Sequence, residues 1–130
     1  MIIGIGTDIV EVGRIEGVFQ RQGEVFAKRL LSEQEWSRFK DHPFPARFLA
    51  KRWALKEAVS KALGTGLAQG VSFHNMTIKN HESGQPYLEL TGGALEKSNS
   101  LGITSWSISV SDEKTHAVAF AVAEKTSKIR

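Results

Sequence analysis

Residues 45–66 constrain the fold more than any other part of the sequence. Proline is favoured at the first position of a helix and glycine just after its last turn, so Pro45 and Gly64 predict the two ends of one long helix. The apolar side chains that cover well over half of its circumference are Phe48, Leu49, Trp53, Leu55, Val59 and Leu63. Because such a helix leaves little surface free for solvent, we expect most of it to be packed against other elements.

The same segment holds the positive charge of the chain. Residues 47–66 contain five bases and one acid, whereas residues 1–46 carry six bases against seven acids and residues 67–130 carry six against six. The formal net charge of the whole chain is only +3. A concentrated positive site on an otherwise neutral chain indicates an anionic ligand, and a phosphate fits best. The bases are too few and too localised to favour nucleic acid, so we expect no nucleic-acid partner.

A strand and a helix are predicted at the start of the sequence. Residues 1–7 combine isoleucine with glycine and predict a strand, with Asp8 at its end. Residues 10–20 have the apolar spacing of a helix.

A capping box marks the start of the next helix. Ser32 and Glu35 have the spacing at which each side chain bonds the backbone of the other. We expect a helix to follow, to bury Trp36 and Phe39, and to end before Pro43.

The second half of the sequence is predicted to be mostly strand. The expected elements are a hairpin of strands 71–79 and 86–91 around the turn 80–85, a short helix 92–101, and a second hairpin of strands 105–111 and 116–124 around residues 112–115. The expected class is α+β, with a mainly antiparallel sheet packed against the long helix. At 130 residues we expect a single domain over residues 1–130.

The last expected strand has one face of large side chains, Val118, Phe120 and Val122, and one face of alanines. Both faces can therefore be covered. The alanine face would allow another backbone to come close. This leaves two alternatives for it, a contact with a second subunit or the core of the chain itself.

Several function classes are excluded by what the sequence lacks. It has no cysteine, so disulfides, thiolate catalysis and cysteine–zinc sites are ruled out. The patterns of a serine-hydrolase elbow, a zinc-protease helix and a phosphate-binding P-loop are absent, and the four histidines are scattered without ligand spacing. Because the sequence shows no basic leader and no apolar run of about 20 residues, we expect a cytoplasmic protein without a membrane partner.

Asp8 and Glu57 are the two carboxylates that stand out. On pattern alone, Asp8 fits a helix N-cap better than a metal ligand, and Glu57 fits an ordinary surface pair with Lys61 one turn later. The apolar surface of the long helix argues against that pair, because it places Glu57 near packed structure, where a carboxylate needs a partner or a cation. Two carboxylates with water and phosphate oxygens would suit Mg²⁺, which prefers hard oxygen ligands.

The sequence Gly64-Thr65-Gly66 has two interpretations. It is a common way to end a helix, and its glycines would also let the backbone approach a ligand closely. A phosphate at this place would meet the unfavourable end of the helix dipole. Lys61 and a divalent cation would have to offset that effect.

Six segments share a combined pattern: residues 4–10, 47–52, 56–58, 61–66, 84–88 and 107–113. They include Gly-Ile-Gly-Thr-Asp-Ile-Val, Arg-Phe-Leu-Ala-Lys-Arg, Lys-Glu-Ala and Lys-Ala-Leu-Gly-Thr-Gly. Together they closely resemble the bacterial holo-acyl-carrier-protein synthases. Each segment alone would be weak, but the combination is specific and extends over nearly the whole chain.

The resemblance implies a Mg²⁺-dependent phosphopantetheinyl transferase. Such enzymes move the 4′-phosphopantetheine arm of coenzyme A to a serine of apo-acyl carrier protein, in support of fatty acid biosynthesis, and release adenosine 3′,5′-bisphosphate. The resemblance implies that Asp8 and Glu57 are Mg²⁺ ligands and that Glu57 and Lys61 are catalytic residues. It implies that the coenzyme A contacts are Arg52, Lys61, Gly64, Thr65, Gly66, Ser109 and Ser111. It also implies that Arg14 contacts the carrier protein. Arg14 is expected beside the metal site, two helical turns after Asp8.

Phosphoryl transfer needs charge neutralisation and in-line positioning rather than covalent chemistry, so the absence of a nucleophile motif is expected. Glu57, a metal-bound water and Glu35 remain alternatives for the base that deprotonates the acceptor serine. Many relatives have histidine where this sequence has Ser107, and often another at Asp112, so the resemblance does not extend to an imidazole role at these positions.

The resemblance also implies assembly. Larger relatives contain two such units in one chain, and the short members form trimers with sites at the subunit interfaces, so we expect a homotrimer. The rivals from other classes are a non-catalytic RNA- or nucleotide-binding module, which would bind in a salt-sensitive way without Mg²⁺, and a structural oligomeric protein.

Overall fold

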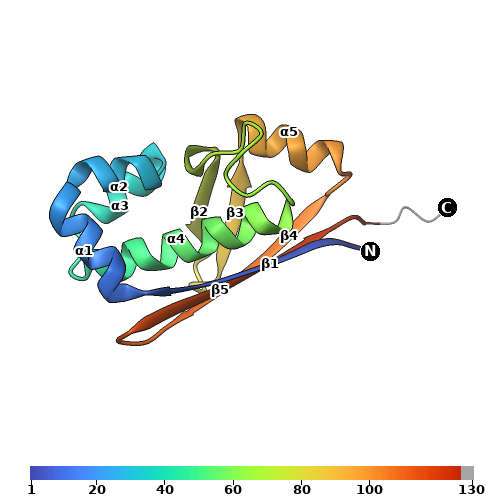
Figure 1. Cartoon of the computed structure of the whole chain (residues 1–130). Helices are drawn as coiled ribbons and strands as arrows, with labels where there is room; N and C mark the ends of the chain where they lie inside the picture. The colour runs from blue at the N-terminus through green and yellow to red at the C-terminus, as the bar shows by residue number, and fades with distance from the viewer. Residues whose placement is uncertain (127–130) are drawn as a thin grey trace.

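A long helix lies at the centre of the computed structural model, which describes residues 1–126 (Figure 1). This helix, α4, spans Pro45–Ala62, and eleven of its 18 residues are buried. Gly64 follows its end with a φ of 80°. Both predicted ends are confirmed, because proline suits the first turn of a helix and a positive φ just after the last turn favours glycine.

One side of α4 packs on a three-stranded antiparallel sheet of order β1-β5-β4. The strands are β1 (Ile2–Glu11), β4 (Ser105–Asp112) and β5 (His116–Glu124). The four alanines of the central strand β5 are fully buried on the face that meets α4, so the alanine face is core of the chain rather than a subunit contact. β1 comes equally close, since a Cβ at Gly4 or Gly6 would overlap the carbonyl oxygen of Ala62 or Ala58.

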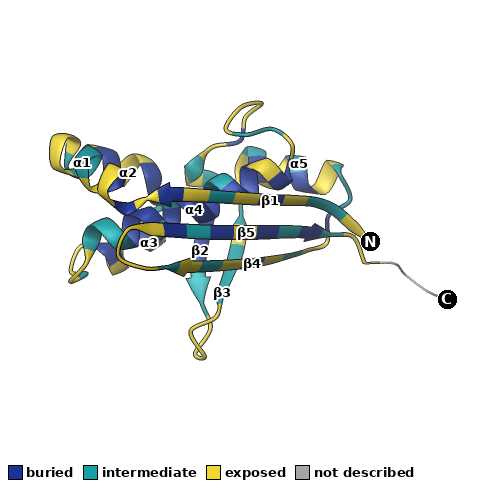
Figure 2. Ribbon diagram, turned by 60° about the horizontal axis from the view of Figure 1, so that its bottom comes forward, coloured by how far each residue is buried: buried dark blue, intermediate teal, exposed yellow. Residues whose placement is uncertain are grey.

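The opposite face of this sheet, which we call the outer face, is open. It carries Ile5, Ile9 and Phe120, which are 62%, 67% and 51% exposed, together with Val118 and Val122. In Figure 2 the sheet lies in front of α4, and exposed and buried residues alternate along its strands. Within one chain only the alanine face of β5 meets a helix, so the face of large side chains is left without a covering element.

Other elements complete the fold on the side of the sheet that carries α4 (Figure 1). They are α1 (Val12–Gln22), α2 (Glu24–Leu30), α3 (Glu33–Phe39), the 3₁₀ turn η1 (Phe73–Asn75), β2 (Met76–Asn80), β3 (Pro86–Leu90) and α5 (Gly92–Ser100). β2 and β3 pair antiparallel, so the predicted α+β class is confirmed. Within residues 1–126, no helix is long and apolar enough to cross a membrane.

The capping box at the start of α3 is confirmed in both directions. The Ser32 Oγ accepts a hydrogen bond from the backbone N–H of Glu35 at 3.4 Å, and the Glu35 Oε1 accepts one from the backbone N–H of Ser32 at 2.9 Å. Phe39 is buried as expected, whereas Trp36 is only partly buried against the core.

The first strand is longer than its sequence predicts, and this changes the position of Asp8. β1 continues through Asp8 to Glu11, and Glu11 is the N-cap of α1. Asp8 therefore does not cap a helix, and the interpretation favoured on pattern alone is wrong. The β-branched residues Ile9 and Val10 extend the strand beyond the two glycines.

Two other boundaries differ from expectation. The sequence pattern does not predict α2, which Gly23, with a φ of 58°, separates from α1. β2 begins at Met76 rather than at Val71, because residues 73–75 form the 3₁₀ turn.

Candidate active site

The structure brings Asp8, Glu57 and Lys61 together between β1 and α4. Asp8 lies within β1 opposite Ala119, one of the buried alanines, so its side chain is on the face that meets α4. The Lys61 Nζ donates to Asp8 Oδ1 at 3.1 Å and to the backbone oxygen of Thr7 at 3.0 Å. We call Asp8, Glu57 and Lys61 the open cluster. Lys61 thus pairs with Asp8 and not, as a simple surface pair would require, with Glu57.

The charges of the open cluster are incompletely balanced. Glu57 is half-buried, and burial raises the pKa of its carboxyl; nearby Asp8 raises this pKa further, and Lys61 opposes both effects. The Asp8 Oδ2 is buried without a hydrogen-bond partner among the described residues. An unsatisfied carboxylate oxygen beside a second carboxylate favours the binding of a cation.

Asp8 and Glu57 are the residues of this site that could hold a metal ion. Both offer hard oxygen ligands of the kind that Mg²⁺ takes from proteins, and the Asp8 Oδ2 is free to serve as one. Within residues 1–126, no group of three or more histidine, cysteine, aspartate or glutamate side chains could hold a metal. A cation at this pair would therefore need water or substrate oxygens as its other ligands.

The loop after α4 begins one turn beyond Lys61. Gly64 and Gly66 have φ angles of 80° and 58°, and a Cβ at either would meet nothing within 4 Å. Glycine is therefore required here by backbone conformation rather than by crowding. The Gly66 N–H donates to the Ser60 oxygen at 3.1 Å, and the Thr65 Oγ1 donates to the Gly66 oxygen at 2.7 Å. The loop ends the helix and also leaves open space around both glycines.

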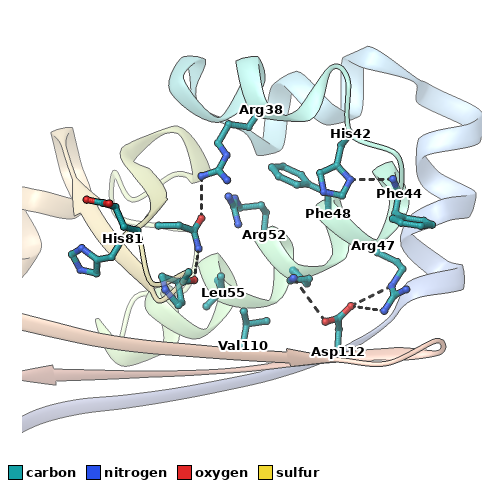
Figure 3. A pocket seen from close by; sticks show the side chains of 15 residues that line it. Arg38, His42, Phe44, Arg47, Phe48, Arg52, Leu55, His81, Val110 and Asp112 are labelled. Carbon is teal, nitrogen blue, oxygen red and sulfur yellow. Dashed lines mark hydrogen bonds and ion pairs between the residues drawn. The ribbon is translucent and has the colours of Figure 1, made fainter.

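Arg52 lies elsewhere, on the wall of a pocket of about 730 Å³ between α4 and the turn that joins β2 to β3 (Figure 3). Arg52 and Lys61 are nine residues apart, which at about 100° per residue puts them on opposite sides of the helix. The charged residues that line this pocket are Arg38, Arg47, Lys51, Arg52, Glu82 and Asp112. We call it the basic pocket.

Asp112 is a residue of the basic pocket whose contacts the sequence did not predict. Its Oδ2 accepts from Arg47 Nε at 3.2 Å and Nη2 at 3.0 Å, and its Oδ1 lies 3.8 Å from Lys51 Nζ (Figure 3). The one signal in the sequence is that Asp112 shares the inward side of an alternating strand with Val110.

Behind Arg52 lies a second charged group that is enclosed by protein. Lys56 is 0% exposed, and its Nζ donates to Glu35 Oε1 at 2.6 Å, to the Leu30 oxygen at 2.7 Å and to the Phe73 oxygen at 3.2 Å. The Arg52 Nε lies 3.1 Å from Glu35 Oε2, without hydrogen-bond geometry. Burial lowers the pKa of Lys56 and of Arg52, and Glu35 opposes both shifts. We call Glu35, Arg52 and Lys56 the closed cluster.

The closed cluster eliminates Glu35 as a candidate base. Glu35 is 1% exposed; its Oε1 accepts from Lys56, and its Oε2 accepts from the backbone N–H of Ile78 at 2.9 Å. A base must come within hydrogen-bond reach of the proton that it removes, and an enclosed carboxylate cannot do so. The capping-box pattern identifies the position of Glu35 on α3 but not these partners, which are distant in the sequence.

Ser109 and Ser111 lie on the outer face of the sheet. They are exposed and stand opposite Phe120 and Val118 of β5. Asp8 projects from the other face, so these serines cannot join the open cluster of the same chain.

Arg14 is an exposed residue of α1. The expectation that two helical turns separate it from Asp8 is wrong, because residues 8–11 are extended strand and α1 begins only at Val12. Its place relative to the open cluster therefore does not follow from helical spacing.

Comparison with known proteins identifies the family. A family model described as the 4'-phosphopantetheinyl transferase superfamily matches residues 4–121. The chain is 58% identical over 127 residues to the holo-[acyl-carrier-protein] synthase of Hydrogenovibrio crunogenus, covering 98% of this chain and 100% of that protein. It is 49% identical over 124 residues to the synthase of Photorhabdus laumondii, covering 95% and 98%.

Solved structures agree. The holo-[acyl-carrier-protein] synthase of Neisseria meningitidis matches with a TM-score of 0.89 and 44% identity, covering 96% of this chain and 100% of that one. The Helicobacter pylori synthase, solved in complex with coenzyme A, matches with a TM-score of 0.81 and 35% identity, covering 92% and 99%. Because the family model spans most of the chain and these relatives match over nearly their full length, the chain belongs to the 4'-phosphopantetheinyl transferase superfamily.

Proposed function

We propose that this chain is a holo-acyl-carrier-protein synthase. It transfers the 4′-phosphopantetheine arm of coenzyme A to a serine of an apo-acyl carrier protein and releases adenosine 3′,5′-bisphosphate. The observation that carries this proposal is the open cluster, in which two carboxylates and a lysine from distant parts of the sequence meet at one site. The reaction serves fatty acid biosynthesis in the cytoplasm. The chain forms a single domain, and this domain contributes all three residues of the open cluster.

Mg²⁺ is the cofactor that we propose for the open cluster, with Asp8 and Glu57 as its protein ligands. The unsatisfied Asp8 Oδ2 and the raised pKa of Glu57 support this assignment. When bound, the ion supplies positive charge to the oxygens of the diphosphate.

The remaining roles follow from charge and proton balance. The oxygen of the carrier serine forms a bond to the phosphorus that bears pantetheine, and the bond from that phosphorus to the bridging diphosphate oxygen breaks. Negative charge develops on the leaving nucleotide, and Lys61, whose ammonium lies at the cluster, donates to it. The serine proton passes to Glu57 or to a water molecule, since Glu35 is enclosed.

Coenzyme A contacts are proposed at two places. The loop at Gly64, Thr65 and Gly66 is adjacent to Lys61 and serves the diphosphate, and the basic pocket at Arg52 serves an anionic part of the nucleotide.

A homotrimer with sites at the subunit interfaces would bring the separated contacts together. Arg52 lies on the side of α4 away from Lys61, and Ser109 and Ser111 lie on the outer face, so one chain does not gather them at one site. The outer face is an exposed apolar surface of the kind that subunits cover. Light scattering should show a trimer that Phe120→Glu disrupts; a fully active monomer would refute this assembly.

Carrier docking is assigned to Arg14, which is exposed on α1. Arg14→Glu should raise KM for the carrier strongly and weaken its salt dependence, because exposed charges act mainly on encounter. KM for coenzyme A should stay unchanged, as should both constants in Lys97→Glu, a matched change on α5. A rise in KM for coenzyme A alone would move Arg14 to the nucleotide site.

The decisive assay is mass spectrometry of an apo-acyl carrier protein after incubation with this chain, coenzyme A and Mg²⁺. We expect the carrier to gain the mass of one phosphopantetheine arm, and to gain nothing when its acceptor serine is replaced by alanine. If the carrier keeps its original mass while the chain is folded, the proposal fails and a non-catalytic nucleotide-binding module becomes the better account.

A further inference from the structure

We propose that Lys61 is the internal counter-ion of Asp8 in the absence of a divalent cation, and that cation binding at the open cluster releases it. This proposal rests on the metal site of the proposed function and concerns what happens before coenzyme A arrives. It gives Lys61 two successive partners, first a carboxylate of its own chain and then the substrate diphosphate.

The geometry shows that Lys61 is held at two points on a neighbouring element. Its Nζ donates to Asp8 Oδ1 at 3.1 Å and to the Thr7 oxygen at 3.0 Å, both on β1, although Lys61 belongs to α4. Two acceptors hold the ammonium beside the carboxylate that we assign to the metal. The side chain of Asp8 is 16% exposed, so its charge is poorly hydrated, and the Lys61 ammonium partly balances it.

The Lys61 ammonium alone does not balance the negative charge of the open cluster. Two carboxylates share one ammonium, which leaves an excess negative charge. The Asp8 Oδ2 has no partner among residues 1–126, even with Lys61 on the other oxygen. A divalent cation balances the pair better than one ammonium does, and it repels an ammonium held at the same carboxylate.

Release of Lys61 is easy because its side chain is 51% exposed. A flexible four-carbon stem in contact with solvent loses little packing when its ammonium moves away. The loop that begins one turn later, at Gly64, is where we place the diphosphate. Cation binding therefore frees the ammonium next to the group that it is proposed to contact during transfer.

Thermodynamic linkage makes this proposal measurable without turnover. If a cation must displace Lys61, removing Lys61 must strengthen cation binding, by a factor on the order of ten. Calorimetric titration with Mg²⁺ alone should show this gain in Lys61→Gln and no binding in the double variant Asp8→Asn with Lys61→Gln. Lys51→Gln is the matched control, because it removes the same charge from the same helix but from a lysine beside Asp112.

A second readout follows Lys61 directly in the wild-type chain. The side-chain ammonium signal in nitrogen-15 NMR, assigned by its loss in Lys61→Gln, should lose the signature of a hydrogen-bonded ammonium on saturation with Mg²⁺ and without coenzyme A. An unchanged signal at saturation overturns the proposal. So does a gain in affinity no larger than that of Lys51→Gln, or a complete absence of Mg²⁺ binding.

The two proposals fail separately. A chain that transfers phosphopantetheine while Lys61 stays on Asp8 at Mg²⁺ saturation disproves the counter-ion role and leaves the function intact. A chain that releases Lys61 on cation binding but never modifies a carrier disproves the function and leaves the counter-ion role.

Discussion

Lys56 and Glu57 are neighbours in the sequence but belong to clusters of opposite character. In the closed cluster, Lys56 is 0% exposed and donates to three oxygens, so each of its three N–H groups has a partner. In the open cluster, the side chain of Lys61 is 51% exposed and the Asp8 Oδ2 has no partner in the described part of the chain. An enclosed charge whose donors all have partners, such as Lys56, holds elements together, whereas a partly exposed charge pair with an unpartnered oxygen is available to a ligand.

The two clusters also connect α4 to different parts of the fold. Lys56 contacts the end of α2, Glu35 in the first turn of α3 and the turn η1, so the closed cluster fixes α4 against the helical side of the fold. The open cluster joins α4 to β1 on the sheet side. We therefore expect variants of Glu35 and Lys56, the enclosed members of the closed cluster, to change stability and variants of the open cluster to change turnover.

The largest effect is expected from Asp8→Asn. Loss of a metal ligand should lower the rate of transfer by about 10³-fold or more, because a bound ion supplies several kcal/mol of charge stabilisation. The variant should unfold no more easily than the wild type, since Asp8 has an unsatisfied oxygen in the fold. Carrier mass and urea unfolding check the two halves of the prediction. Near-normal transfer by Asp8→Asn in the presence of a chelator would remove the metal site from this account.

Lys56→Met should give the opposite result. It leaves Glu35 charged, buried and short of its main partner, so the free energy of unfolding should fall by about 3–5 kcal/mol. Lys51→Met removes a more exposed pair from the same helix and should cost about 1 kcal/mol or less. Urea unfolding of the two variants measures the difference. If the free energy of unfolding falls by the same small amount in both variants, the closed cluster does not stabilise the fold.

Lys61→Met should lower kcat by about 10²-fold, the scale of losing one positioned donor. Its free energy of unfolding should change by about 1 kcal/mol or less, because the Lys61 side chain is half exposed. Steady-state kinetics and thermal unfolding on the same sample provide the comparison. A loss of stability with kcat untouched would place Lys61 with the structural residues instead.

The smallest effect concerns pH. The folded chain raises the pKa of Glu57, so as pH rises through this range the unfolded chain loses its proton first and the free energy of unfolding declines. Glu57→Gln removes this decline, so its stability relative to the wild type should increase as the pH rises above the ordinary glutamate pKa of about 4.3. The exposed Glu33→Gln serves as control. If the stability difference between Glu57→Gln and the wild type does not vary with pH, then burial and Asp8 do not raise the pKa of Glu57.

Local patterns predicted much of this molecule. The ends of α4, the capping box at Ser32 and the two antiparallel hairpins all follow from short stretches of sequence, and the structure has each of them. The extent of β1 does not follow, because aspartate is so often an N-cap that Asp8 suggested a helix start where the chain remains extended.

Contacts between distant residues account for the rest. Lys61 meets Asp8 and Lys56 meets Glu35 across long stretches of sequence, so spacing on α4 could only suggest a Glu57–Lys61 pair. The alternation in β4 identified two faces, but only the packing of β5 on α4 shows that Ser109 and Asp8 lie on opposite sides of the sheet. The resemblance supplied the residues that we propose for the site, and the structure shows where each of them lies relative to α4.

The most direct test of the open cluster as the reaction site is anomalous scattering from Mn²⁺ in crystals of this chain grown with coenzyme A. We predict one anomalous peak, from a Mn²⁺ ion bound by the carboxylates of Asp8 and Glu57, and we predict that the Lys61 ammonium is no longer hydrogen-bonded to Asp8. A peak at Asp112 or at Glu35, or none at Asp8 and Glu57 in an enzyme that transfers phosphopantetheine in solution, would contradict the account.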